Sequence, residues 1–255
     1  MTQSAYETLM SGIMDIGKTL LISGAEIYRV EDTITRLISA YGGTSSEVTA
    51  VPSHIITSAS FEGREYTLTR RVDQTETDLE LLDRINSLSR RLCSEKPAPE
   101  QIHKLLEEAI NCKTYQNWQR SMIYALTSFG FALFFGGNWI DATVSAAIAG
   151  SLFWVRKLIT QNGGNRVLVA LFCSAYAALL TKLFVRMGLG NDADKIIIGI
   201  VMVLIPGIEM VNGFRDFSKG DIQAGLMHLA EALFLGVIIA VGAAGMFMLL
   251  DSVGI

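Results

Sequence analysis

The sequence predicts a multi-pass α-helical membrane protein with an N-terminal α+β soluble domain. Its charges are unevenly distributed: residues 1–118 contain 12 Lys and Arg and 17 Asp and Glu, whereas residues 119–255 contain 9 and 8. In the second part these few charges separate apolar runs of roughly 18 or more residues, which a bilayer core accommodates and a soluble domain does not expose. We therefore predict a cytoplasmic α+β domain over 1–118 and a transmembrane domain over 119–255.

The composition also excludes several classes of protein. The apolar runs exclude a simple soluble enzyme, and the residue usage is not that of a collagen-like, disordered or disulfide-scaffold chain. A net charge of −4 gives no reason to expect nucleic acid as a partner. Cys93, Cys112 and Cys173 form no close pair and no metal-ligand spacing, so we expect reduced thiols and no metal.

A long amphipathic helix is predicted over residues 9–41. Its apolar side chains recur at steps of three and four residues, which places them in one stripe. The stripe has a gap at Ser23–Gly24, where the helix could bend or break. Gly42–Gly43 is a natural C-terminal stop.

Three β-strands are predicted next, because the residue usage changes to Val, Ile, Thr, Phe and Tyr. They cover Glu47–Val51, His54–Phe61 and Tyr66–Val72. Glu62–Glu65, between the last two strands, has the composition of a hairpin turn. The soluble part is thus predicted to contain a small sheet after its first helix.

Two further helices complete the predicted soluble domain. Thr77–Glu80 resembles a capping box that opens a helix running to about Cys93. Pro97 and Pro99 then separate it from a second helix that runs to about Lys113.

Five membrane spans are predicted in the second part of the chain. They lie near 119–136, 139–156, 166–187, 195–213 and 222–250. Gly136–Gly137 ends the first span, and Pro206-Gly207 interrupts the fourth. The fifth is long enough to tilt or to include an interfacial turn.

Basic residues at the ends of these spans predict their orientation. Junctions on the side of the N-terminal domain carry seven Lys or Arg, and the opposite junctions carry two. Because positive residues remain cytoplasmic, we expect a protein of the cell (plasma) membrane with its N-terminal domain in the cytoplasm and its C-terminus outside. Because the first residues contain no basic stretch followed by an apolar one, we expect no cleaved signal peptide. The seven are Lys113, Arg120, Arg156, Lys157, Arg166, Arg215 and Lys219, and the two are Arg186 and Lys195.

The interrupted fourth span is the most informative stretch of the sequence. Pro206 removes a backbone donor and Gly207 loosens the next turn, and broken helices at membrane depth tend to line substrate sites. Glu209, Asn212 and Asp216 follow at steps of three and four residues and share one face. An acidic group inside a span is costly and normally faces a polar interior. These five residues are therefore predicted to bind substrate or an ion. The alternative is a proline kink near the membrane end, with Arg215 and Asp216 in a solvated loop.

Two further charged residues fall inside predicted spans. Glu231 in the fifth span is three residues from His228, with which it could interact, and a histidine beside a carboxylate can titrate near neutral pH. The alternative is a pair at headgroup level. Lys182 lies well inside the third span and either pairs with a carboxylate or extends to the interface.

In the soluble part, Glu26, Arg29 and His54 are the candidate functional residues. Glu26 and Arg29 can pair at a spacing of three, or simply occupy an exposed helix face. Ser53 and Ser58 place hydroxyls near His54, but no Gly-x-Ser-x-Gly motif supports a serine hydrolase. Walker A and dinucleotide motifs are absent from the sequence. We therefore expect no cofactor, and expect any pumping to draw on an ion gradient.

Two groups of residues resemble signatures of the threonine/serine exporter family. The first is Ser23–Thr33, with the sequence SGAEIYRVEDT. The second consists of Pro206-Gly207, Asn212, Arg215-Asp216, Gly220-Asp221 and Glu231-Ala232. The strand of His54 and Arg70-Arg71 fit as well. The resemblance covers about residues 10 to 250, and the two signatures lie on either side of a soluble-to-membrane junction.

The resemblance implies a secondary transporter that exports small polar metabolites, either amino acids such as threonine and serine or a dicarboxylate such as succinate. It further implies that this chain is the larger subunit of a split type, with the soluble domain and five spans. The implied partners are a smaller companion membrane subunit, further copies of this chain, or both. Two other hypotheses remain: a membrane-anchored enzyme with a hydrolase-like cytoplasmic domain around His54 and Glu26, and a ligand-sensing regulatory membrane protein.

Overall fold

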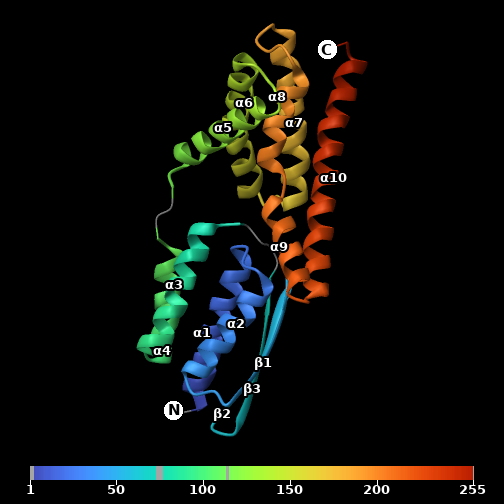
Figure 1. Ribbon diagram of the computed structural model, residues 1–255. Helices are drawn as coiled ribbons and strands as arrows, with labels where there is room; N and C mark the ends of the chain where they lie inside the picture. The colour runs from blue at the N-terminus through green and yellow to red at the C-terminus, as the bar shows by residue number, and fades with distance from the viewer. Residues whose placement is uncertain (1–2, 73–76, 113–114, 255) are drawn as a thin grey trace. The chain divides into compact units, whose positions relative to one another are not determined.

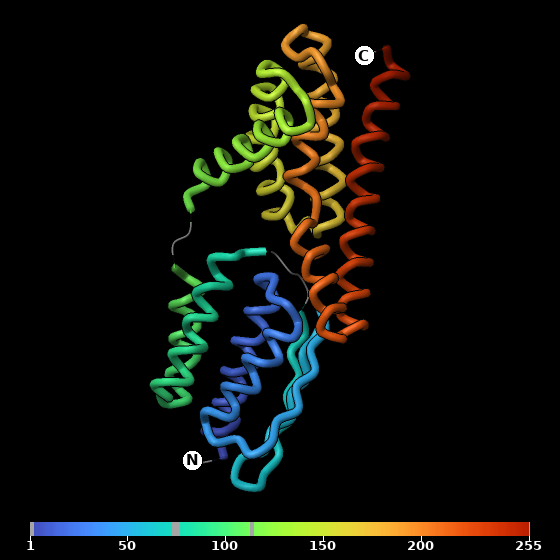
Figure 2. The backbone as a smooth tube through the Cα atoms, viewed as in Figure 1, coloured from blue at the N-terminus to red at the C-terminus, as the bar shows by residue number. Residues whose placement is uncertain are grey.

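The computed structural model describes residues 3–72, 77–112 and 115–254, and the chain forms two compact units (Figures 1 and 2). Unit 1 comprises Met1–Thr114 and Ile208–Ala230, and unit 2 comprises Tyr115–Gly207 and Glu231–Ile255. Unit 1 therefore includes residues 208–230, which the sequence analysis assigned to the end of the fourth span, the start of the fifth and the loop between them. The predicted domain boundary at residue 118 stays a prediction.

Unit 1 begins with two helices rather than one. α1 covers Gln3–Ile22 and α2 covers Ile27–Ala40, so the predicted helix over 9–41 is interrupted after Ile22. At the break, Gly24 has a φ of +89°, and the amide N–H groups of Gly24 and Ala25 donate to the carbonyls of Leu21 and Leu20. This is a Schellman ending, in which glycine takes the left-handed conformation that other residues adopt at a cost.

A three-stranded antiparallel sheet follows α2. Its strands are β1 (Ser45–Val51), β2 (His54–Phe61) and β3 (Arg64–Arg71), in the order β1-β2-β3. The predicted sheet is confirmed, but the hairpin loop is shorter than the predicted Glu62–Glu65. Only Glu62 and Gly63 form it, with φ values of 50° and 77°. Positive φ at both central residues is typical of a type I′ turn, whose twist matches that of the strands.

Two helices complete the N-terminal part of unit 1: α3 (Leu79–Glu95) and α4 (Pro99–Ile110). The capping residue of α3 is Asp78, whose carboxylate accepts a 2.9 Å hydrogen bond from the amide of Leu81. The predicted box beginning at Thr77 is thus wrong by one residue. The predicted end of the second helix, Lys113, lies outside the described residues.

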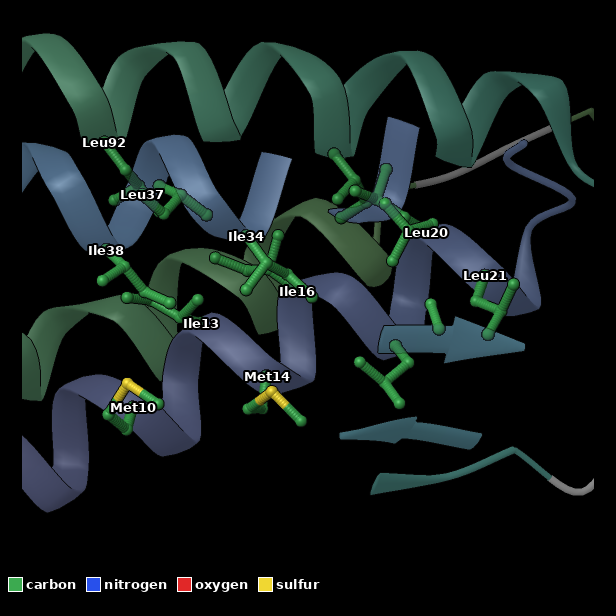
Figure 3. Packing of buried hydrophobic residues seen from close by; sticks show 14 of the residues in the cluster. Met10, Ile13, Met14, Ile16, Leu20, Leu21, Ile34, Leu37, Ile38 and Leu92 are labelled. Carbon is green, nitrogen blue, oxygen red and sulfur yellow. The ribbon is translucent and has the colours of Figure 1, made fainter. Parts of the chain in front are cut away.

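α1 and α2 form the middle layer of this part, with the sheet on one face and α3 and α4 on the other (Figure 1). This position explains why α1 is buried on nearly every side. Its Ile13 and Ile16 lie near Ile34 of α2, and these three side chains and that of Met10 are fully buried (Figure 3). Each aliphatic side chain buried in this way contributes roughly 1.5–3 kcal/mol to folding.

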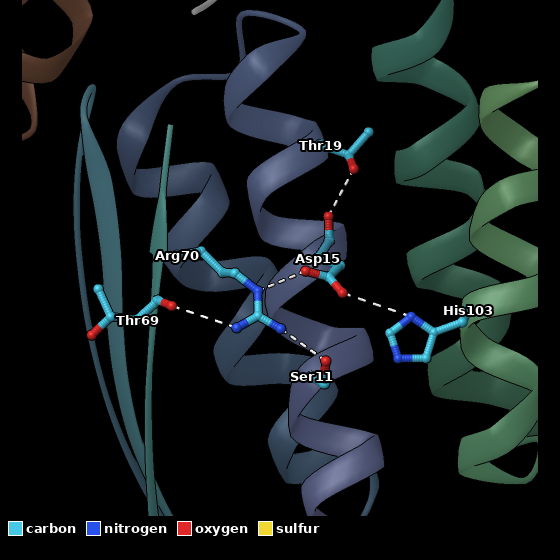
Figure 4. A network of polar contacts seen from close by, with 6 residues as sticks. All are labelled: Ser11, Asp15, Thr19, Thr69, Arg70 and His103. Atoms are coloured by element: carbon cyan, nitrogen blue, oxygen red, sulfur yellow. Dashed lines mark hydrogen bonds and ion pairs between the residues drawn. The ribbon is translucent and has the colours of Figure 1, made fainter. Parts of the chain in front are cut away.

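A polar network joins three elements across this core (Figure 4). Arg70 on β3 donates from Nε to Oδ1 of Asp15 on α1 at 2.7 Å and from a terminal nitrogen to Ser11 at 2.8 Å. His103 on α4 lies 3.7 Å from the other carboxylate oxygen of Asp15. The network fixes the sheet and α4 on opposite sides of α1, so we interpret it as structural.

Six further helices follow, most of them apolar. They are α5 (Asn117–Phe134), α6 (Trp139–Gln161), α7 (Arg166–Arg186), α8 (Ala193–Leu204), α9 (Gly207–Ser218) and α10 (Ile222–Ser252). Among the described residues, α6, α7 and α10 are long and apolar enough to cross a membrane, and the broken pair α8–α9 makes a fourth crossing if it counts as one span. α5 corresponds to the first predicted span, but its first turn is polar and it does not meet the same criterion. The count of five spans stays a prediction.

The helices of unit 2 approach closely through small polar residues. The hydroxyls of Ser128 on α5 and Ser145 on α6 lie 2.6 Å apart, and Ser145 also donates to the carbonyl of Ile196 on α8 at 3.1 Å. A Cβ added at Gly199 would lie 2.6 Å from the Ser145 hydroxyl, so only glycine fits there. Large apolar side chains such as Leu126 and Met248, each 73% exposed, remain on the outside, as expected of a surface that faces lipid.

Candidate functional site

The candidate site begins at the break between α8 and α9. α8 ends at Leu204, Ile205 is extended with a ψ of 131°, and α9 begins at Gly207, so the predicted interruption at Pro206-Gly207 is confirmed. On α9, Asn212 and Asp216 are buried and Glu209 is half-buried. The three residues occupy one face of the helix, at the predicted spacing.

Asn212 connects this helix to the loop between α1 and α2. Its side-chain amide donates a 3.0 Å hydrogen bond to the carbonyl of Gly24, and only 6% of the residue is exposed. The two residues are 188 positions apart in the chain and belong to the same unit. The sequence analysis assigned them to different domains, so this contact was not anticipated.

Glu26 lies at the centre of a second contact between the same segments. It is the N-cap residue of α2, but its side chain makes no capping bond. Instead, Arg215 of α9 donates to its Oε1, and Nε of Arg29 lies 2.7 Å from its Oε2. The predicted pairing of Glu26 with Arg29 is confirmed. Arg215, which the sequence analysis considered as a membrane-end charge and as part of the second family signature, supplies the third charged group.

The carboxylate of Glu26 is 6% exposed, whereas both arginine side chains are more than half exposed. Burial by itself raises the pKa of Glu26. Hydrogen bonds from Tyr28 and Arg215 and the charge of Arg29 outweigh that effect, so the pKa lies below its usual value. Although Arg29 is close enough for an ion pair, Oε2 receives no well-directed hydrogen bond from the described part of the chain. It is therefore an ionised, buried acceptor with capacity for another donor.

These residues line a pocket of about 250 Å³. Sites for drug-sized ligands measure about 300–1,000 Å³, so this volume suits a small metabolite. Its lining combines apolar side chains with the charged and amide groups of Glu26, Arg29, Asn86, Asn212 and Arg215. The lining residues are Leu20, Gly24, Ala25, Glu26, Arg29, Leu79, Leu82, Asn86, Ile208, Val211, Asn212 and Arg215.

Asp216 does not line this pocket but lies on the same helix, one residue after Arg215. It is fully buried, and its Oδ2 is 2.9 Å from Nδ1 of His228 on α10. α9 and α10 cross closely here, because a Cβ added at Gly213 would lie 2.9 Å from the Leu229 side chain. The alternative of a solvated loop is therefore wrong for Asp216.

The predicted interaction between His228 and Glu231 is wrong. His228 pairs with Asp216, whereas Glu231 belongs to unit 2 and accepts a 2.7 Å hydrogen bond from Arg166 at the start of α7. Lys182 lies in the same unit and pairs with Asp251 at 2.5 Å. Of the two alternatives for Lys182, pairing with a carboxylate is thus the one observed.

His54 occupies the first position of β2, and its Nδ1 is 3.1 Å from the exposed hydroxyl of Ser53. It is not among the residues that line the pocket at Glu26. In the part of the chain that the structure describes, no three His, Cys, Asp or Glu side chains are arranged to hold a metal ion.

Sequence reasoning missed the α3 residues that line the pocket, and it did not place Arg215 at a binding site. Leu79, Leu82 and Asn86 come from α3, a helix whose sequence shows only amphipathic periodicity. No local pattern marks them as ligand-binding, since their role depends on tertiary packing. For Arg215 a signal existed: it follows Asn212 by three residues and therefore shares its face of the helix.

Comparison with known proteins gives a consistent picture. The model of a family described as "Putative threonine/serine exporter" matches residues 11–250. A "Probable threonine/serine exporter" of Mycobacterium tuberculosis is 25% identical over 230 residues, covering 89% of this chain and 43% of that protein. The chain therefore spans less than half the length of that relative.

Two shorter relatives bear a different name. "Probable succinate transporter subunit YjjP" of Klebsiella aerogenes is 23% identical and covers 88% of this chain and 86% of that protein. The protein of the same name from Escherichia coli is 22% identical, with coverage of 89% and 88%. No solved structure matches the chain.

Proposed function

The chain belongs to the threonine/serine exporter family, and from this premise we propose that it is a subunit of a secondary transporter that exports a small metabolite carrying both a carboxylate and an ammonium group. Serine and threonine are the simplest candidates. The relatives' names support the role in transport, and the pocket at Glu26 supports the class of substrate.

One observation carries this proposal: a buried carboxylate shares a small pocket with two arginines that pair with it and with a side-chain amide. The guanidinium groups of Arg29 and Arg215 are more than half exposed and can turn toward the carboxylate of a substrate. Oε2 of Glu26 would accept from the substrate ammonium. The apolar side chains of Leu79 and Leu82 would contact a short side chain.

The proposed site extends along α9 toward the helix break. Asn212 holds α9 against the loop at Gly24. Glu209 lies one turn before Asn212 on the same face of α9. We propose that Glu209 and Asn212, beside the break at Pro206-Gly207, bind the substrate or a coupled ion.

We also propose the membrane arrangement that the sequence predicts. The chain would lie in the cell membrane with five spans, a cytoplasmic N-terminal domain and an outside C-terminus. Two relatives are named subunits, which supports assembly with a smaller companion membrane subunit, with further copies of this chain, or with both. Efflux by a strictly monomeric, reconstituted chain would contradict the assembly, and a C-terminal reporter active in the cytoplasm would contradict the orientation.

The test of the proposed function is efflux of labelled serine, threonine and succinate from vesicles that contain the full chain, with and without the companion subunit. We expect efflux of serine and threonine, and its loss in Arg215→Gln. Arg186→Gln, which changes an arginine that pairs with the carbonyl of Gly254 in unit 2, is the matched control. If Arg215→Gln exported serine and threonine at the rate of the parent, the pocket would not be part of the transport pathway.

A dicarboxylate is the second candidate substrate. Two arginines in one pocket would suit two carboxylates, and two relatives are named for succinate. The buried, ionised Glu26 opposes this reading, since it would repel the second carboxylate at close range. The vesicle experiment separates the two candidates directly.

A further inference from the structure

A second cavity in unit 1 plays no part in the proposed substrate contacts. α2 and α3 lie side by side (Figure 1), and a cavity of about 450 Å³ opens between them. This volume falls within the range of about 300–1,000 Å³ that is typical of small-molecule sites. Arg29 and Asn86 also line the pocket at Glu26, whereas the other lining residues do not. The space is therefore a separate candidate site, and we call it the α2–α3 cavity.

The lining of the α2–α3 cavity carries an excess of positive charge. Among the described residues that line it, Arg29, Arg36 and Arg90 are basic, and Asp32 is the one acid. Burial raises the pKa of the Cys93 thiol, which also lines the cavity, so this thiol is neutral at neutral pH and cancels none of the charge. The cavity is thus suited to an anion.

The contacts of two of these arginines leave guanidinium N–H groups for a ligand. Nε of Arg36 lies 2.8 Å from Oδ2 of Asp32, but 73% and 53% of the two side chains are exposed. Water and salt screen such a pair, which therefore contributes little. A terminal nitrogen of Arg90 donates to the neutral hydroxyl of Ser87 at 2.9 Å. Because each guanidinium has five N–H donors, both arginines can also bind an oxyanion.

Neutral polar groups and a further cation lie beside these arginines. Ser89 is 7% exposed, and its hydroxyl donates to the carbonyl of Asn86 at 2.8 Å. The side chain of Thr33 also lines the cavity. Tyr28 lines it too, and the ammonium of Lys219 lies 5.1 Å from the centre of the Tyr28 ring. A bound anion would therefore meet hydroxyl and amide groups as well as positive charge.

We propose that the α2–α3 cavity binds a small organic anion with two or more oxyanion groups, either a polycarboxylate or a phosphate ester. Arg36 belongs to α2 and Arg90 to α3, so one such anion bridges the two helices, with one oxyanion group on each guanidinium. Serine and threonine carry no net charge and do not match this lining. The sequence analysis left a ligand-sensing role open, and this cavity provides a site for it.

Binding is measured by calorimetric titration of the purified full chain at constant ionic strength, without serine. Citrate is the polycarboxylate probe and adenosine monophosphate is the phosphate-ester probe, so the two titrations distinguish the sources of the anion. We expect one of the two probes to bind. Arg36→Gln and Arg90→Gln should each weaken its binding about tenfold, because each variant loses a charge-assisted hydrogen bond.

Arg91→Gln is the matched control for these variants. Arg91 is also an exposed arginine of α3, but it pairs with Glu95 at 2.8 Å and does not line the cavity. The same change of charge, one residue from Arg90, should therefore leave the affinity for the probe as in the parent. Thermal melting of each variant checks that the fold persists.

Alkylation of Cys93 shows whether the probe occupies this cavity. Cys93 is half-buried in the lining, whereas Cys112 is exposed and is not among the lining residues. Mass spectrometry after brief treatment with N-ethylmaleimide measures the labelling of both thiols in one sample. We expect the bound probe to slow the labelling of Cys93 several-fold and to leave that of Cys112 unchanged. Arg90→Gln should remove this protection.

Three results would overturn the proposal. The first is that neither probe binds the parent, and the second is that Arg36→Gln and Arg90→Gln bind as the parent does. The third is binding without protection of Cys93, which would place the anion elsewhere on the chain. These measurements use neither serine nor transport, and Arg36 and Arg90 do not line the pocket at Glu26. Failure of the proposed function would therefore leave this result standing, and failure here would leave the proposed function untouched.

Discussion

Glu26→Gln is the substitution that most sharply separates an amino-acid site from a dicarboxylate site. Glutamine has nearly the shape of glutamate and can still accept from Arg215 through its carbonyl oxygen. It removes the negative charge that an ammonium group would meet at Oε2. The exchange should therefore weaken binding of serine or threonine while leaving, or improving, binding of a dicarboxylate.

The size of the effect follows from the burial of this carboxylate. Its side chain is 6% exposed, so solvent does little to screen a new contact at Oε2. A hydrogen bond to a charged group contributes about 1.5–3 kcal/mol. Because each 1.4 kcal/mol corresponds to a factor of ten in affinity, serine should bind roughly 10- to 100-fold more weakly to Glu26→Gln.

The assay is calorimetric titration of the purified full chain with serine and, separately, with succinate. Glu108→Gln is the matched control, because Glu108 is an exposed residue of α4 and does not line the pocket. Thermal melting of each variant checks that the fold persists. Parental affinity for serine in Glu26→Gln would refute the reasoning, and so would an equal loss for serine and succinate in a variant that melts normally.

Three further predictions follow from the geometry. Gly24→Ala should lower the stability of the full chain by about 1–2 kcal/mol, because alanine is strained at a φ of +89°; denaturant unfolding measures the loss, and an unchanged midpoint would contradict it. Asp141→Ala should cost about 1–3 kcal/mol, because Oδ1 of Asp141 accepts from the amides of Asn191 and Asp192 at 2.7 and 3.2 Å; a melting temperature like that of the parent would count against this assignment. Since the pKa of Glu26 is lowered from 4.5, its stabilising contribution exists above that pH and disappears as pH falls through the folded pKa; melting temperatures from about pH 5 to about pH 3 should fall more steeply for the parent than for Glu26→Gln, and parallel curves would contradict the sign.

Much of the fold can be predicted from the sequence because strands, turns and helix breaks depend on local sequence signals. The strand around His54 and the break at Pro206 were predicted correctly, since strand composition and a proline inside an apolar run each point to one structure. The division of the first helix was only partly anticipated. The apolar stripe has a gap at Ser23–Gly24 and then resumes with the same spacing. The stripe alone therefore does not show that the chain forms two separate helices, α1 and α2.

The site was harder to predict because its parts come from distant segments. Asn212, Glu26 and Arg29 were each singled out, but as members of separate domains. Their meeting depends on the packing of α9 against the loop at Gly24, which no local pattern encodes. Hydropathy also assigned the first half of α9, up to residue 213, to a membrane span, although its buried residue Asn212 is polar.

Pairings of charged residues show the same limit. A spacing of three residues correctly predicted the contact between Glu26 and Arg29. The same spacing suggested a contact between His228 and Glu231, but each has a closer partner on another helix. Helical spacing shows which residues can meet, whereas tertiary packing determines which of them do.

The central claim is that the segments around Gly24 and Asn212 form one ligand site. Hydrogen exchange of the full chain, followed by mass spectrometry with and without saturating serine, tests it most directly. We predict that peptides covering residues 20–29 and 208–215 are protected together by serine, and that both effects disappear in Glu26→Gln. Protection of only one segment, or protection confined to the region of Arg166 and Glu231, would contradict the account.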